Sequence, residues 1–124
     1  MDKKSIFGLS ENIAAAISYI FGPFSGIAVL IMERENKFVR FHALQSTLWF
    51  LLLWVTRWVI GFITAILGNI WIVGGLFGFA GGLLDSIFWL INIVSLVFLF
   101  YKAFTNATFK IPIIGDVAWA QVNK

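Results

Sequence analysis

Hydrophobic positions fall into three long segments separated by short polar stretches. The first covers residues 12–32 without a charge, the second runs from about 41 to 67, and the third runs from 70 to 104. A helix rises about 1.5 Å per residue, so about 20 apolar residues cross the hydrocarbon core of a bilayer. The pattern therefore predicts membrane-spanning helices, and we place three full spans at about residues 12–32, 43–67 and 86–104.

The segment between the second and third spans does not fit a full crossing. Residues 70–84 contain five glycines, which weaken a helix, and reach only about 22 Å as a helix. We predict a short Gly-rich helix or a re-entrant segment there, with a fourth span as the alternative. An interfacial tail, 105–124, completes an all-α bundle that forms a single transmembrane domain over residues 1–124. Gly22 and Pro23 should kink the first span.

Composition supports a polytopic membrane protein. Of 124 residues, 60% are hydrophobic and 12% are charged, about half the share usual in soluble domains. The net charge is +3, but the basic residues flank apolar segments, so we expect the lipid bilayer and no nucleic acid as a partner. With no cysteine and one histidine, no metal or cofactor site is expected.

Basic residues set the expected orientation, because they accumulate on the cytoplasmic side of the cell membrane. With three spans, six of them share one side and two lie on the other, which predicts a cytoplasmic first loop and C-terminus in a multi-pass protein. With four spans the charges decide little. The six are Arg34, Lys37, Arg40, Lys102, Lys110 and Lys124, and the two are Lys3 and Lys4.

Polar side chains inside the apolar segments are the candidate functional residues. Hydrocarbon does not solvate them, so they should face other helices or water. We predict that Arg57 pairs with Asp85; lining a path or binding an anionic headgroup is the alternative. His42 is interpreted as a hydrogen-bonded residue at the mouth of the second helix, with a pH-switch or ligand role as the alternative. Gln45 and Asn92 lie on the same polar stripes as these residues.

Small residues spaced along the segments predict close helix packing. They suggest a non-enzymatic membrane subunit that acts in a homo-oligomer or larger complex. A small-solute channel or transporter, with a polar path lined by the second helix, is the competing function. No catalytic constellation is visible in the sequence. The small residues are Ala14, Ser18, Gly22 and Gly26 in the first span, and Gly74, Gly78 and Gly82 in the Gly-rich segment.

Three stretches, residues 10–19, 33–46 and 110–116, carry a family resemblance. The second contains Phe-Val-Arg-Phe-His-Ala, and the third is a Lys-x-Pro-x-x-Gly-Asp motif. Together they resemble the small bacterial and archaeal membrane proteins related to Tic-twenty, a chloroplast protein-import component. The resemblance implies a helical membrane protein with a charged first loop and a relation to protein translocation, but no activity.

Overall fold

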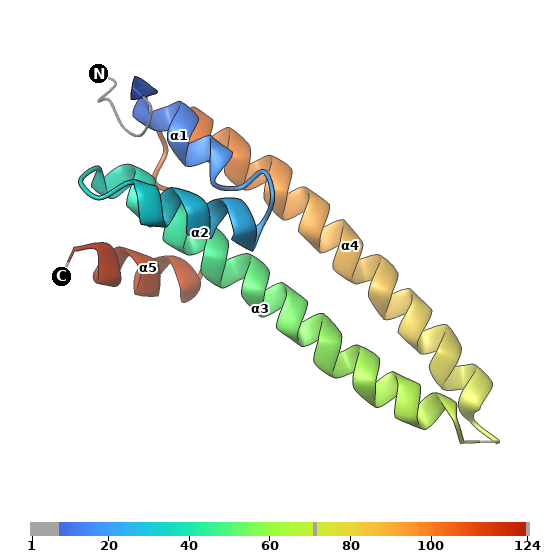
Figure 1. The fold of residues 1–124 in the computed structure, drawn as a ribbon. Coiled ribbons are helices and arrows are strands. Elements are labelled where there is room, and N and C mark those ends of the chain that lie inside the picture. Colours follow the sequence, from blue (N-terminus) through green and yellow to red (C-terminus); the bar gives the residue numbers. More distant parts are fainter. Residues whose placement is uncertain (1–7, 71, 124) are drawn as a thin grey trace. The chain divides into compact units, whose positions relative to one another are not determined.

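The computed structural model describes residues 8–70 and 72–123, and the regular secondary structure within them is helical. It comprises α1 (Glu11–Ile17), α2 (Pro23–Met32), α3 (Lys37–Gly68), α4 (Gly74–Phe104) and α5 (Ile114–Val122) (Figure 1). By length and composition, α3 and α4 could each cross a membrane. The all-helical fold is therefore confirmed, with two long apolar helices, whereas the membrane bundle and its number of spans stay predictions.

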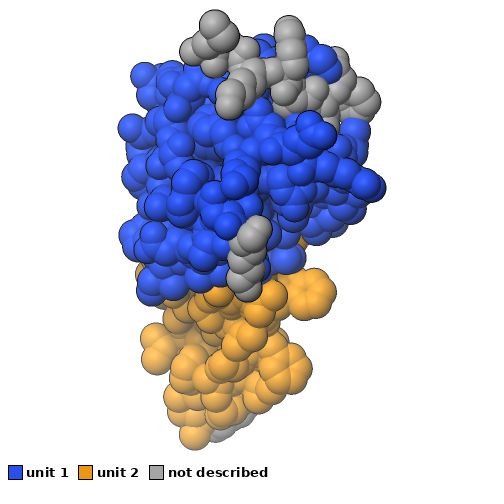
Figure 2. Space-filling model, turned by 90° about the vertical axis from the view of Figure 1, so that its left-hand side faces the viewer, with its two compact units in different colours: residues 1–51, 95–124 blue, residues 52–94 orange. Residues whose placement is uncertain are grey.

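The chain divides into two compact units, coloured separately in Figure 2. The first unit combines Met1–Leu51 with Ser95–Lys124, and the second is Leu52–Val94. The first unit contains α1, α2, α5, the beginning of α3 and the end of α4. The second contains the remaining parts of α3 and α4.

The expected single helix over residues 12–32 is wrong, because the chain breaks between α1 and α2. Gly22 adopts φ 60°, and Pro23 begins α2 without a backbone N–H to continue the earlier ladder. Two serine hydroxyls replace the lost hydrogen bonds. Ser25 Oγ donates to the Ser18 carbonyl at 2.9 Å, and Ser46 Oγ donates to the same carbonyl at 2.6 Å. The proline therefore produces a full break, where only a kink was expected.

The Gly-rich stretch differs from the expected separate segment. It forms the beginning of α4, a continuous helix of 31 residues that includes the predicted span 86–104. Glycine lowers helix propensity by about 1 kcal/mol in water, but in an apolar medium an unpaired backbone costs more. Small size also allows close approach, since a Cβ on Gly81 would lie 3.4 Å from Thr64 Oγ1. Apolar surroundings and packing against α3 thus outweigh the low helix propensity of these glycines.

Candidate functional site

The first unit contains a buried polar cluster formed by Tyr19, His42 and Gln45, none of which has exposed surface. Tyr19 Oη lies 2.7 Å from His42 Nδ1, and Gln45 Nε2 donates to Tyr19 Oη at 3.0 Å. His42 Nε2 lies 3.0 Å from the carbonyl oxygen of Ala107. The cluster therefore joins the residues just after α1, the beginning of α3 and the chain after α4.

The partners of this cluster define its proton arrangement. A carbonyl oxygen only accepts, so His42 Nε2 carries the hydrogen that it donates to Ala107. In the neutral ring Nδ1 then accepts, and the Tyr19 hydroxyl donates to it. This leaves the Tyr19 oxygen free to accept from Gln45. The network is satisfied with a neutral histidine, in which both ring nitrogens of His42 are hydrogen-bonded.

Gln45 holds the segment between α4 and α5 against α3. Its Nε2 donates to the Phe109 carbonyl at 2.9 Å, and its Oε1 accepts from the Ile111 N–H at 2.8 Å. A Cβ on Gly115 would lie 2.7 Å from Gln45 Oε1 and 2.5 Å from Lys110 Cα. The sequence did not predict this docking, because Gln45 binds backbone groups, and a backbone group is the same whatever the residue type.

The turn before α5 is strained. Ile113 adopts φ 71° and ψ −56°, and the Ile114 N–H donates to the Pro112 carbonyl at 2.8 Å. These values describe a γ-turn of the rare positive-φ kind, which is unfavourable for a β-branched residue. The Ile113 side chain is 76% exposed, so its own packing does not explain the conformation. The docked backbone on either side holds the turn.

Close packing of α2 on α3 depends on Gly26. A Cβ there would lie 2.6 Å from Thr47 Oγ1 and 2.8 Å from the Ala43 carbonyl oxygen. Ala14 and Ser18, from the same small-residue stripe, are fully buried in this unit. Since substitution at Gly26 would push against backbone, this contact tolerates no larger residue without movement.

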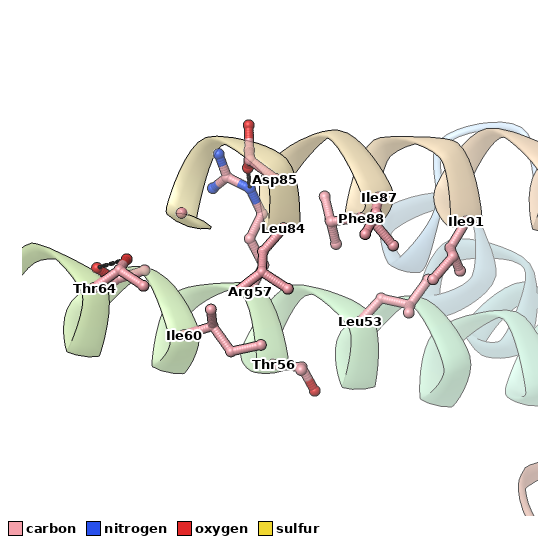
Figure 3. Close-up of a pocket in the computed structure, with 12 residues that line it drawn as sticks. Leu53, Thr56, Arg57, Ile60, Thr64, Leu84, Asp85, Ile87, Phe88 and Ile91 are labelled. Atoms are coloured by element: carbon pink, nitrogen blue, oxygen red, sulfur yellow. Dashed lines mark hydrogen bonds and ion pairs between the residues drawn. The ribbon is translucent and has the colours of Figure 1, made fainter. Parts of the chain in front are cut away.

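The second unit brings Arg57 of α3 and Asp85 of α4 together (Figure 3). Arg57 Nε donates to Asp85 Oδ1 at 2.7 Å, and the guanidinium carbon lies 5.5 Å from the Phe88 ring centroid. The two side chains are 41% and 42% exposed. They are thus paired but only partly covered by their own chain.

A groove of about 320 Å³ lies between α3 and α4 beside this pair. Its wall is mostly apolar, with a few polar side chains near the ion pair. Such a surface suits apolar side chains or lipid better than a polar solute. The lining residues are Leu53, Thr56, Arg57, Ile60, Gly61, Thr64, Gly81, Leu84, Asp85, Ile87, Phe88 and Ile91.

The other predicted residues of the second unit are not brought into this groove. Asn92 is partly exposed on α4. A Cβ on Gly78 or Gly82 would meet nothing within 4 Å, whereas one on Gly74 would collide with the Gly68 carbonyl oxygen. Over the part of the chain that the structure describes, no group of three or more acidic or histidine residues could hold a metal ion.

These features define a class of protein: a small helical protein with two helices long and apolar enough to cross a membrane, an ion pair between those helices and a buried polar cluster. The chain belongs to the magnetosome magnetite crystal formation protein family (MamF_MmsF), whose sequence model matches residues 6–118. The expected Tic-twenty relationship is therefore wrong. The three stretches that suggested it all lie within the residues that this family's model matches.

Archaeal relatives agree with the membrane assignment. A UPF0132 membrane protein of Archaeoglobus fulgidus is 39% identical, over 92% of this chain and 97% of its own. Another of Methanocaldococcus jannaschii is 38% identical, over 93% of this chain and 91% of its own. No solved structure matches the chain significantly. The protein is thus a membrane protein of this family.

Proposed function

We propose that the protein is a non-enzymatic membrane subunit that self-associates within the bilayer of the cell membrane. The observation that carries the proposal is the ion pair between Arg57 and Asp85, which the single chain leaves 41% and 42% exposed. Most side chains around it on α3 and α4 are apolar. In a bilayer, the exposed part of the pair therefore faces hydrocarbon unless another protein surface covers it.

The energetics favour protein cover over lipid. Placing one arginine in the middle of a spanning helix costs roughly 2.5–3.5 kcal/mol on insertion scales. Pairing with Asp85 removes part of this cost, but the remaining guanidinium N–H groups still need acceptors. Large apolar side chains elsewhere on α3 and α4 are exposed and can face lipid without a protein partner. Examples are Trp58, at 76% exposed, Phe62, at 69%, and Leu90, at 63%.

The same proposal includes an orientation. The turn between α3 and α4, residues 69–73, contains no basic residue, whereas Lys37 and Lys102 lie at the opposite ends of these helices. The positive-inside rule then favours a cytoplasmic location for the first loop and the C-terminus. Single cysteines at Asn36→Cys and Asn123→Cys test this. They should resist an impermeant thiol reagent in intact cells and react after lysis, and labelling in intact cells would reverse the orientation.

Subunit counting tests self-association. The protein would carry one fluorophore per chain and be reconstituted in lipid vesicles at a low protein-to-lipid ratio. We expect photobleaching in two or more steps, and a single step at every ratio would refute the proposal. Flux across the same vesicles addresses the channel alternative. Specific flux that Arg57→Leu abolishes would favour a channel over a packed subunit.

A further inference from the structure

We infer that two copies of the chain meet in the membrane across one face of α4, and that Arg57 of each copy contacts Asp85 of the other. This inference rests on the proposed self-association and identifies the surface that performs it. The face consists of Gly75, Gly78 and Gly82, and we call it the glycine face.

Among the residues that the structure describes, the glycine face has no side chain or backbone packed against it. A Cβ on any of its three glycines would meet nothing within 4 Å, whereas Gly81 packs on Thr64 of α3. With about 100° between successive residues of a helix, the glycine face lies about 20–80° to one side of Asp85. Gly81 lies about 40° to the other side. Asp85 therefore stands between the contact with α3 and the glycine face.

The ion pair has unused hydrogen-bonding capacity. Arg57 donates to Asp85 through Nε, so the four N–H groups on its two terminal nitrogens are not used in this bond. Figure 3 shows the second carboxylate oxygen of Asp85 directed away from α3. A helix seated on the glycine face would come close to that oxygen. It would also shield the pair from hydrocarbon.

Charge complementarity selects a second copy as the occupant. Across a two-fold axis each surface meets itself, so a patch with one arginine and one aspartate is self-complementary. Two such patches form a neutral ring of four charges. A lipid phosphate would satisfy Arg57 but repel Asp85, and an acyl chain would satisfy neither. Glycines spaced by four also let two helix backbones approach closely, as membrane dimers require.

Paired charge reversals test the inference. An Arg57→Asp chain carries an acid at both positions, and an Asp85→Arg chain carries an arginine at both. Each variant alone would place like charges together and should dimerise more weakly by about tenfold or more. Mixing the two places opposite charges across both contacts. We therefore expect the mixture to regain dimerisation in vesicles as heterodimers, measured by energy transfer between differently labelled chains.

The mixture excludes a folding artefact, because neither variant regains its internal ion pair when mixed. Rescue can then come only from contact between copies. Unchanged dimers of the single variants, or no rescue on mixing, would overturn this interface while leaving self-association intact. Monomeric wild type would instead refute the proposed function itself.

Cysteine crosslinking locates the surface independently. Ser86 lies one turn after Gly82, next to the glycine face, and Ile87 lies about 100° further around α4. The chain has no native cysteine, so each variant presents one thiol. We expect oxidised Ser86→Cys to form dimers at least about tenfold faster than Ile87→Cys. Equal rates, or faster crosslinking of Ile87→Cys, would place the contact elsewhere.

Discussion

Replacing Gln45 by leucine should release the segment that joins α4 to α5. Gln45 is fully buried, and its side chain makes three hydrogen bonds. Leucine has similar size but can satisfy none of the partners. The Ile111 N–H would lose the Gln45 oxygen that it donates to, and the Phe109 carbonyl would lose a donor at a partly buried site.

The magnitude follows from these two backbone groups. A buried group left without a partner costs about 1–3 kcal/mol, and the partly buried carbonyl belongs at the lower end of this range. We therefore expect the docked segment to lose about 3 kcal/mol, which corresponds to roughly a 100-fold larger open population. The Tyr19–His42 hydrogen bond does not depend on Gln45 and should persist.

Hydrogen exchange in lipid nanodiscs measures this opening. We expect peptides covering residues 107–111 to exchange about 100-fold faster in Gln45→Leu, with the middle of α4 unchanged. Thr47→Val is the matched control, because the Thr47 hydroxyl donates to the Ala43 carbonyl of its own helix. Equal acceleration in both variants would refute the reasoning. Acceleration spread evenly over α4 would mean global destabilisation instead of local release.

Three further experiments test the energetics of the fold. The first is a double-mutant cycle read by thermal stability in lipid, in which Arg57→Leu and Asp85→Leu should each lower the free energy of unfolding by about 2–3 kcal/mol. The double variant should lose well below the sum of the two single losses, and additive losses would mean that the charges act separately. Gly26→Ala should destabilise by about 1–3 kcal/mol, because its Cβ would lie 2.8 Å from a backbone oxygen. Gly61→Ala is the control and should be neutral or slightly stabilising, because a Cβ there would meet nothing within 4 Å; equal effects would contradict the packing described. Ile113→Gly should stabilise the first unit by up to about 1 kcal/mol, because glycine adopts the positive φ of this position without strain, whereas Ile113→Ala should not stabilise it. A loss of stability with glycine would show that the turn is not strained.

Membrane character, helical structure, the position of α3 and the second half of α4 could be predicted from the sequence. They depend on runs of apolar residues, and every such run in a bilayer must satisfy its own backbone hydrogen bonds. The same reasoning predicted that Arg57 pairs with Asp85, because a charge in hydrocarbon needs an opposite charge. The structure brings these two residues together.

Predictions from local helix propensity were wrong at two positions along the chain. Glycines from Gly74 onwards suggested an interruption, yet α4 is continuous, since an apolar environment penalises an unpaired backbone more than glycine weakens a helix. Pro23 suggested a kink, yet the chain breaks completely, because Ser46 of α3 supplies a hydroxyl to the exposed carbonyls. In both cases a neighbouring helix or the surrounding medium decided the outcome.

The buried cluster of the first unit required the tertiary structure. Polarity alone marked His42 and Gln45, but their partners are Tyr19 and the backbone carbonyls of Ala107 and Phe109. The His42–Ala107 contact spans 65 positions of the chain. A backbone carbonyl has the same chemistry in every residue, so a sequence pattern cannot show which one a side chain reaches. Only the folded path of the chain after α4 places these carbonyls beside α3.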